Sequence, residues 1–580
     1  MGGRFRTGSR RVARMAVCSS LAALGGALTF AGPALGQRVA SPRMAGTALA
    51  AHALPTTART TFAHGATPPS MALNAALAPG TSATATTEAT GSPAADAIDG
   101  DATTQWCSAQ WTGSLTVDLG QVRRLSGVGV TLGATSTTAL VDLSYATTNG
   151  AWQPVPGGQQ QSVPAGEPVY WSERAGALDA RYVKIDVTDN DGTPPCIDEL
   201  RLFERVPAAT IPDRGADLSF EPQEEAAGAR FTDDGVPGSV LSILNRHGLN
   251  YVRLRLWVNP PPGYSDLASD LRMAKRIAAA GDKLYLDIHY SDFWADPQHQ
   301  DIPAAWQGQD LTQLSQTVRS YTQQVLGAFA AQRTPVDMVS IGNEIRNGML
   351  WPAGQVDWTA DTGWDNLATL LKAGVAGARA GNPRGHQLLV MLHFDQGGDN
   401  ADSVRFYDNL VNRGVPFDVI GLSYYPFFHG TLTQMRTNID DLAGRYGKPI
   451  VIAESQYPWT LAAGDSTGNF VWQASQVSGG YPANPGGQLS FYNDLLSILA
   501  QVPNHRGTGL FYWEPEWIPG VGWEPGAGTP NDNLTLFSFT GQALPSVGLF
   551  QSPQAVCAHY APYSSPCSVP SGASAGPGNY

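Results

Sequence analysis

The 580-residue chain is poor in charged residues, and the charge that it carries is mostly negative. Asp, Glu, Lys and Arg make up 15% of the residues, and the formal net charge is −13 at pH 7, whereas charged residues are typically about 25% of a protein. An acidic surface repels phosphate backbones and anionic lipid headgroups. We therefore expect no nucleic-acid partner and no membrane-surface partner, while a neutral glycan is compatible with such a surface.

Long hydrophobic runs are also scarce, because only the N-terminal region contains one. Five arginines and no acidic residue precede an apolar stretch from Met15 to about Leu35, and Ala34-Leu35-Gly36 has the small-x-small pattern of a cleavage site. This pattern predicts a secretory signal peptide over residues 1–36, exported by the general or the twin-arginine route. A membrane anchor is the alternative, but Gly and Pro interrupt the run. We expect a secreted protein, either extracellular or periplasmic, with no membrane contact after cleavage.

Cysteine is rare as well. Cys18 lies in the predicted signal peptide, and Cys107, Cys196, Cys557 and Cys567 remain. An even number in an exported chain favours disulfides, and no C-x-x-C spacing indicates a metal site. Of the possible pairings, Cys107–Cys196 with Cys557–Cys567 is the simplest, since each bond then stays within one region.

The rest of the chain divides into regions that differ in composition and in hydrophobic pattern. Residues 37–72 are rich in Ala, Thr, Pro and Ser and predict a flexible linker. Residues 73–206 contain short alternating runs separated by Gly-rich turns, which predict an all-β jelly-roll sandwich. Its clearest runs are Ser114–Leu119, Ser126–Thr131 and Tyr182–Val187. Residues 553–580 form a C-terminal tail whose last part is rich in Gly, Pro and Ser.

In residues 211–552, strand-like runs alternate with amphipathic helical stretches, as in an α/β domain. Eight such units in this length predict a (β/α)8 barrel. An open doubly wound sheet is the alternative, but no glycine-rich phosphate turn follows the first strand. The predicted strands are Gly215–Phe220, Tyr251–Val258, Lys283–His289, Val336–Ile341, Gln387–Phe394, Phe417–Tyr424, Pro449–Glu454 and Gly509–Trp513.

Two glutamates stand where barrel strands are predicted to end. Glu344 follows the fourth strand and Glu454 closes the seventh. Active sites of such barrels lie at the carboxyl ends of the strands, and glycoside cleavage requires two carboxylates. A single glutamate is most often a solvated surface group. Two glutamates that each follow an apolar run point to a shared catalytic mouth, because a carboxylate is costly there unless it is used.

Other strand ends carry polar and aromatic groups that could bind a sugar. An arginine beside a carboxylate keeps it ionised, and tryptophan can stack on the apolar face of a sugar ring. The candidates are Arg253, Arg255, Trp257, His289, Asp292, Trp294, Trp351, His393, Tyr424 and Trp513. One of the two arginines is expected to form a structural ion pair. No His-x-His or H-E-x-x-H spacing is present, so we expect no catalytic metal and no cofactor for catalysis.

The runs at these strand ends closely resemble glycoside hydrolase family 53, the endo-β-1,4-galactanases that act on pectic arabinogalactan. The resemblance recurs in order along residues 211–552 and implies a retaining double-displacement mechanism. It implies that Glu344 is the acid/base, that Glu454 is the nucleophile, and that Asn343 holds the sugar 2-hydroxyl. The matching runs are Gly215–Ser219, Tyr251–Pro260, Leu286–Asp292, Ile341–Ile345, Ser423–Pro426, Ala453–Glu454 and Tyr512–Pro515.

The region 73–206 resembles coagulation-factor 5/8 type C (discoidin) domains, through Ala95–Trp106, Leu115–Gly120 and Ile197–Phe203. The resemblance implies a structural Ca²⁺ held by Asp101, Thr104 and Glu199, and a module that binds sugars at loop aromatics. A scaffold that binds nothing is the alternative.

A second calcium loop is known in some bacterial members of family 53, after the seventh strand. Here that loop contains Asp465 and Asn469, but Ala463 and Thr467 occupy positions where stronger ligands are expected. Ca²⁺ prefers about six to eight oxygen ligands, so the loop is a poor calcium site.

Taken together, the sequence predicts a secreted, monomeric endo-β-1,4-galactanase with a polysaccharide substrate. Another clan A endo-glycanase, such as a mannanase or a cellulase, is the first alternative, because loop contacts set the choice of substrate. A non-catalytic glycan-binding protein is the second alternative. We rank it last because Asn343, Glu344 and Glu454 are all present.

Overall fold

The computed structural model describes most of the chain from residue 62 to residue 550. The predicted signal peptide, most of the linker, the tail and the cysteines Cys557 and Cys567 lie outside the described residues. Within the described residues, no helix is both long enough and apolar enough to cross a bilayer. The described ranges are 62–65, 73–78, 80–101, 103–133, 138–166, 168–173, 178–189, 192–204, 211–260, 263–477, 481–522 and 528–550.

The N-terminal domain is all-β, as predicted, and its strands join into one antiparallel sheet. Its strands are β1 (Phe62–Gly65), β2 (Leu73–Asn74), β3 (Ser82–Ala85), β4 (Trp106–Cys107), β5 (Thr112–Leu132), β6 (Thr138–Ala146), β7 (Gln153–Pro154), β8 (Gln161–Pro164), β9 (Val169–Glu173), β10 (Leu178–Asp189) and β11 (Cys196–Glu204). The predicted disulfide Cys107–Cys196 is present and joins β4 to β11, where the two cysteines face each other in register.

Two details of this domain differ from the prediction. Strand β1 lies inside the segment predicted as a linker, because its backbone pairs with β9. The two runs at Ser114–Leu119 and Ser126–Thr131 form one continuous strand, β5. The first half of β5 pairs with β3, and the second half pairs with β9 and β11, so a change of partner does not require a turn.

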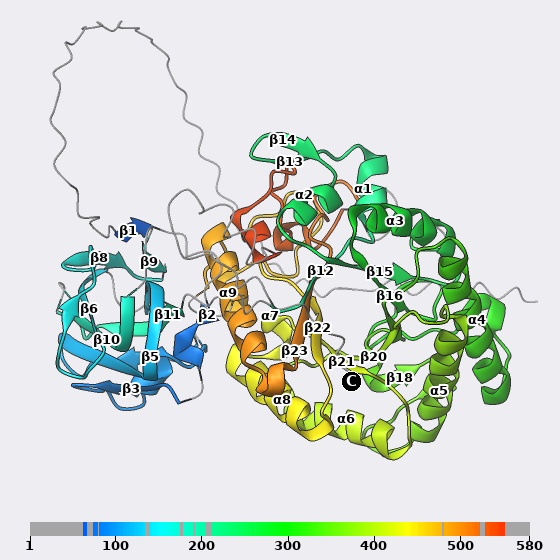
Figure 1. Cartoon of the computed structure of the whole chain (residues 1–580), viewed down its shortest axis with the longest axis horizontal. Coiled ribbons are helices and arrows are strands. Elements are labelled where there is room, and N and C mark those ends of the chain that lie inside the picture. Colours follow the sequence, from blue (N-terminus) through cyan, green and yellow to red (C-terminus); the bar gives the residue numbers. More distant parts are fainter. Residues whose placement is uncertain are drawn as a thin grey trace, which may run out of the picture. The chain divides into compact units, whose positions relative to one another are not determined.

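The C-terminal domain is a closed parallel barrel of eight strands, in the order in which they occur along the chain (Figure 1). The first strand pairs with the last one, which closes the ring and excludes the open doubly wound sheet. The strands are β12 (Asp213–Asp217), β15 (Tyr251–Leu256), β16 (Lys283–Ile288), β17 (Met338–Ile341), β20 (Leu389–Phe394), β21 (Val419–Ser423), β22 (Ile450–Ser455) and β23 (Gly507–Tyr512).

Helices surround the barrel strands in Figure 1. Several begin at a side chain that caps the first turn, and Asp266, Asp310 and Thr431 each form a capping box with the residue three positions later. The helices are α1 (Glu221–Ala227), α2 (Val240–Arg246), α3 (Leu267–Ala280), α4 (Leu311–Ala331), α5 (Trp364–Gly381), α6 (Asn400–Asn412), α7 (Pro426–His429), α8 (Leu432–Tyr446) and α9 (Pro485–Gln501). Short antiparallel hairpins, β13–β14 (Phe231–Asp233 and Val236–Gly238) and β18–β19 (Gly348–Met349 and Gly354–Gln355), lie outside the barrel.

A layer of apolar side chains fills the barrel and leaves room for polar groups only toward the strand ends. The layer is tight at Gly215, where an added Cβ would lie 2.2 Å from Cδ1 of Phe511. Its buried members are Tyr251, Tyr285, Met338, Met391, Val419, Val451, Ala453 and Phe511. Because this layer is closed, the polar side chains that follow it along the strands are confined to the barrel mouth.

Buried carboxyl groups gather where α1 meets the segment after β23. Arg255 pairs with Glu514 at 2.7 Å, which identifies Arg255 as the structural one of the two arginines. Glu224 and Glu516 have no such cation, and both carboxyl oxygens of Glu516 lack a hydrogen-bond partner among the described residues. Burial, together with the charge of Glu514, raises the pKa of Glu224 to about 9. Burial also raises the pKa of Glu516 well above its ordinary value.

These shifts predict that Glu224→Gln makes the barrel more resistant to alkaline conditions. An unfolded glutamate ionises near its ordinary pKa, whereas Glu224 holds its proton up to about pH 9. The stability that this group contributes is therefore present below about pH 4 and is lost as the pH rises toward 9. The glutamine variant lacks that loss, and we expect its unfolding free energy to exceed that of the parent by on the order of a few kcal/mol at pH 8.

Urea unfolding at pH 5 and pH 8, followed by tryptophan fluorescence, measures this difference. Glu225→Gln is the matched control, because Glu225 lies next to Glu224 on the same helix but is exposed. Parallel pH dependences of the Glu224→Gln variant and the parent would show that Glu224 is ionised in the folded protein.

Candidate active site

The two glutamates singled out from the sequence meet at the barrel mouth. Glu344 follows the carboxyl end of β17, and Glu454 lies near the carboxyl end of β22. In a closed parallel barrel all of these ends face the same side. After burial, the negative charge of Glu454 is the next cause that raises the pKa of Glu344, as expected for two carboxyl groups at one mouth.

Glu454 is held by two hydrogen-bond donors. Arg253 Nη2 lies 2.6 Å from Oε1, and the Tyr425 hydroxyl donates to Oε2 at 2.8 Å. Burial, together with the charge of Asp287, raises the pKa of the Glu454 carboxyl above its ordinary value, although the charge of Arg253 and the bond from Tyr425 oppose this rise. Both oxygens thus receive donors that favour the ionised carboxylate.

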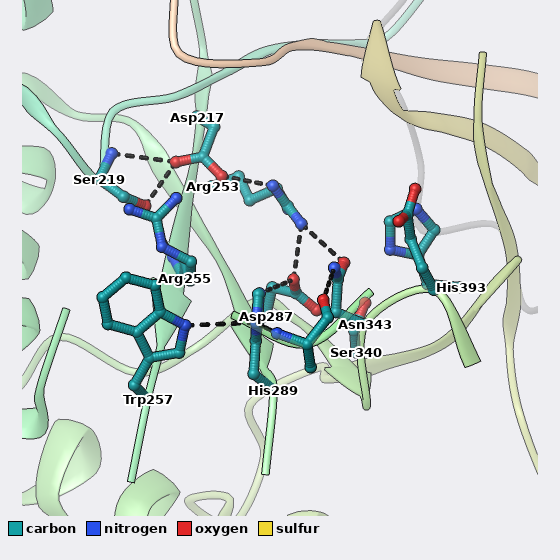
Figure 2. A network of polar contacts seen from close by, with 12 residues as sticks. Asp217, Ser219, Arg253, Arg255, Trp257, Asp287, His289, Ser340, Asn343 and His393 are labelled. Atoms are coloured by element: carbon teal, nitrogen blue, oxygen red, sulfur yellow. Dashed lines mark hydrogen bonds and ion pairs between the residues drawn. The ribbon is translucent and has the colours of Figure 1, made fainter. Parts of the chain in front are cut away.

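Arg253 is the centre of the polar network in Figure 2. Its guanidinium bonds to Asp217, to Asp287 at 2.5 Å, to Glu454 at 2.6 Å and to the Asn343 side-chain oxygen at 3.1 Å. Burial raises the pKa of Asp287, but the charge of Arg253 and a contact with His289 outweigh it and lower that pKa to about 2. The ionised carboxylates and the guanidinium therefore compensate one another inside the barrel.

Glu344 has a different environment. Its Oε1 accepts a hydrogen bond from the Ser423 hydroxyl at 2.6 Å, and no salt bridge links it to a basic side chain of the described residues. Burial, followed by the charges of Glu454 and Asp395, raises its pKa well above the ordinary value. Its backbone has φ = 46°, a left-handed conformation that costs a non-glycine residue about 1–3 kcal/mol and is frequent at functional sites.

The contrast between the two environments distinguishes the two carboxyl groups. Glu454 lies beside a fixed cation, whereas Glu344 lies beside negative charge and accepts from a neutral hydroxyl. When one proton is shared by two interacting carboxyl groups, it resides on the group with the higher pKa. The contrast therefore favours the proton on Glu344 and the charge on Glu454.

Asn343 and His289 support the network from the side of β16 and β17 (Figure 2). The Asn343 amide donates to the Ala295 carbonyl at 2.8 Å, and its oxygen accepts from Arg253. His289 Nδ1 accepts from the Trp257 indole at 3.3 Å and from the Ala295 amide at 3.0 Å. The proton of the neutral ring therefore lies on Nε2, which faces an Asp287 oxygen at 3.3 Å.

The predicted tryptophan platforms differ in exposure. Trp257 and Trp513 are buried and pack against Trp294, with ring centroids 5.1 and 6.0 Å from it. Trp294 and Trp351 are only half-buried, so part of each ring reaches the surface. Trp294 also packs over the Arg255 guanidinium, 4.2 Å from the ring centroid.

Asp292 and Tyr424 both form hydrogen bonds with backbone groups. Asp292 accepts a hydrogen bond from the Ala304 amide at 2.8 Å. Tyr424 is fully buried, and its hydroxyl donates to the Gly430 carbonyl at 2.9 Å. The structure thus places the predicted Tyr424 in the core, and the next residue, Tyr425, is the one that reaches a catalytic carboxylate.

His393 is linked to Glu344 indirectly, through the Ser423 hydroxyl. Its Nε2 lies 2.9 Å from the Ser423 oxygen, which itself donates to Glu344. Burial lowers the pKa of His393 to about 3, so the ring is neutral. Since Ser423 gives its proton to Glu344, its oxygen accepts the His393 Nε2 proton.

Asp287, His393 and Glu454 form a group whose potential metal-ligand atoms lie within 4.8 Å of one another. Arg253 bonds to two of these three side chains. A guanidinium thus already compensates the negative charge of Asp287 and Glu454.

The predicted calcium residues of the β-domain lie around one loop. Thr104 donates to an Asp99 oxygen at 3.0 Å, Asp101 accepts from the Thr103 amide at 3.0 Å, and Glu199 accepts from the Gly100 amide at 2.7 Å. Calcium binding at Asp101, Thr104 and Glu199 stays a prediction.

In the loop after β22, the candidate ligands make internal hydrogen bonds. The Asp465 oxygens accept from the Thr467 amide at 2.6 Å and from the Thr529 amide at 2.9 Å, and the Asn469 amide donates to Ala462. These bonds link the loop to itself and to the segment at Thr529. Calcium at Asp465 and Asn469 likewise stays a prediction.

Comparison with known proteins agrees with this geometry. The family model described as "Glycosyl hydrolase family 53" matches residues 213–550, and the "F5/8 type C domain" model matches residues 82–200. An uncharacterised protein of Niallia circulans is 42% identical over 57% of this chain and 91% of its own. The "probable arabinogalactan endo-beta-1,4-galactanase A" of Aspergillus terreus is 38% identical over 60% of this chain and 98% of its own. The solved "GH53 catalytic domain" of Ignisphaera aggregans is 38% identical, with a TM-score of 0.55, and covers 58% of this chain and 94% of its own.

Proposed function

Because the chain belongs to glycosyl hydrolase family 53, we propose that its barrel cleaves the β-1,4-galactan of arabinogalactan internally, with Glu344 as the acid/base and Glu454 as the nucleophile. The observation that carries this proposal is the contrast between the two buried carboxyl groups, one beside Arg253 and the other beside negative charge. Galactanase relatives that align over nearly their whole length support galactan as the substrate.

In the first step, the ionised Glu454 attacks the anomeric carbon while Glu344 gives its proton to the glycosidic oxygen. The bond between sugar and leaving group breaks, and an ester bond to Glu454 forms. The negative charge moves from Glu454 to Glu344. Since the charge of Glu454 is one of the causes that raise the pKa of Glu344, forming the ester lowers that pKa and prepares Glu344 to act as a base.

In the second step, Glu344 takes a proton from water, and the resulting hydroxyl attacks the anomeric carbon and releases Glu454. Arg253 and Tyr425 again hold the freed carboxylate. With the proton taken from water on Glu344 and the negative charge back on Glu454, the site has regained its starting charge. Two displacements at one carbon leave its configuration unchanged.

The N-terminal domain fits an accessory role in binding carbohydrate. It matches the F5/8 type C family over residues 82–200, and Trp111, in the segment before β5, is 62% exposed. An exposed tryptophan offers an apolar face on which a sugar ring can stack. Secretion of the whole chain is supported by the N-terminal signal pattern and by the Cys107–Cys196 disulfide, which persists in oxidising compartments.

The nucleophile is tested by Glu454→Ala in the full chain. We expect a loss of several orders of magnitude in reducing-sugar release from β-1,4-galactan, as for other covalent nucleophiles. Mannan and carboxymethyl cellulose, assayed beside galactan, separate this activity from those of other clan A endo-glycanases. Intact galactan with the parent chain would refute the proposed substrate, and parental rates with Glu454→Ala would refute the mechanism.

The double displacement predicts that the first product keeps the β configuration. Proton NMR during the first minutes of galacto-oligosaccharide hydrolysis should detect the β-anomer before mutarotation produces the α-anomer. Initial appearance of the α-anomer would assign the reaction to a single displacement by water, with Glu454 as a base.

Ser423 predicts a directed change in the pH profile. Its hydrogen bond favours the ionised form of Glu344 and so lowers that pKa. Ser423→Ala removes this effect, raises the pKa of the acid and moves the alkaline limb of kcat/KM to higher pH. The matched control is Ser340→Ala, because Ser340 is a buried serine of β17 that contacts Tyr285 instead of a carboxylate. An alkaline limb that moves to lower pH would contradict the role of Ser423 as a donor.

A further inference from the structure

Large hydrophobic side chains are exposed at few of the described positions, and three of them lie in the segments that follow two strands at the barrel mouth. Phe428 is 60% exposed, Phe470 43% and Trp472 61%; we call them the rim aromatics. They follow β21 and β22, which are neighbouring strands of the barrel. The other exposed large hydrophobic side chains are Trp111, Val122, Val236 and Val411.

The rim aromatics are continuous with the catalytic carboxylates through a series of ring contacts. Tyr425 donates to Glu454, and its ring centroid lies 5.8 Å from that of Phe427. Phe427 lies 4.6 Å from Phe428, and Phe428 lies 6.3 Å from Phe470 in an edge-to-face arrangement. The aromatic surface therefore extends outward from the nucleophile along one side of the mouth.

The segment that carries Phe470 and Trp472 is pinned to the barrel domain. Val471, between them, is fully buried, and its carbonyl accepts from Asn533 at 2.7 Å. The Gln476 side chain accepts from the Trp472 amide at 3.0 Å and donates to the Phe470 carbonyl at 2.8 Å. These contacts hold the backbone of the segment in place, while the Phe470 and Trp472 side chains on either side of Val471 are exposed.

The exposed apolar surface of the rim aromatics is unfavourable in water unless a ligand covers it. Clustered exposed apolar side chains at a cleft mark a binding surface more often than scattered ones do, and rings that are already ordered lose little entropy on binding. A galactosyl unit has an apolar face formed by its C3, C4 and C5 hydrogens, because its 4-oxygen is axial. Aromatic rings are well suited to cover such a face.

We propose that the rim aromatics form an outer subsite that binds galactosyl units of the polymer remote from the bond being cleaved. This inference rests on the proposed function, since it takes the occupant to be the same β-1,4-galactan chain that reaches Glu344 and Glu454. Short oligosaccharides occupy only the positions near the carboxylates, whereas a long chain extends over Phe428, Phe470 and Trp472. The subsite therefore contributes to the KM of the polymer and leaves the chemical step unchanged.

The test compares two substrate lengths with the full chain carrying Phe428→Ala and Trp472→Ala together. For long β-1,4-galactan we expect KM to rise about tenfold, equivalent to about 1.4 kcal/mol, with kcat retained. For galactotriose we expect kcat/KM to stay within about twofold of the parent. Val411→Ala is the control for losing an exposed apolar side chain on an outer helix, and Phe428→Tyr with Trp472→Phe keeps both rings and should retain the parental KM.

The outcomes separate this proposal from the proposed function. If the parent chain cleaves galactan and the double alanine variant keeps its polymer KM, the subsite is refuted while the function stands. An equal loss on polymer and trisaccharide would also refute it, because the rings would then support the catalytic carboxylates themselves. If the parent chain does not cleave galactan, the proposed function fails, and the subsite for galactan fails with it.

Discussion

The barrel mouth depends on a single guanidinium. Arg253 is 1% exposed and bonds to the carboxylates of Asp217, Asp287 and Glu454. Three buried carboxylates gathered around one point would repel one another without this cation, and each would favour its neutral form. The five donors of an arginine side chain, fixed in one plane, can serve several acceptors at once. A lysine has a compact charge without this planar geometry, so the network requires arginine at this position.

This placement of positive charge makes the site asymmetric. Arg253 bonds to Glu454 and not to Glu344, while both nearby histidines are kept neutral by burial. A protonated His393 would add a cation next to Ser423 and favour ionisation of Glu344. The low pKa of His393 therefore preserves the difference between the two glutamates, and with it the separation of acid and nucleophile.

Much of this arrangement could be predicted from the sequence, because apolar runs that end in polar residues mark the strands and the mouth together. The eight strands and the two glutamates follow from that pattern. The roles of Arg253 and Arg255 do not, since both lie on one face of β15 and their partners, Glu454 and Glu514, come about 200 residues or more later in the chain. Only the closed barrel brings those partners together.

The choice between Tyr424 and Tyr425 shows where local reasoning could have gone further. Gly421, Ser423 and Tyr425 share one phase of a period-two pattern, and Ser423 and Tyr425 are the residues that reach the catalytic carboxylates. Tyr424 has the opposite phase and packs into the core. The pairing of β21 with β22 shifts its register between Leu422 and Ser423, so strand alternation becomes least certain at the position where the site begins. Burial raises the pKa of glutamates in two acidic regions of the barrel, but only one of these regions faces the site of the reaction. At the mouth the raised pKa of Glu344 suits a group that must give a proton to a leaving group, whereas beside α1 the raised pKa of Glu224 and Glu516 affects only the stability of the barrel.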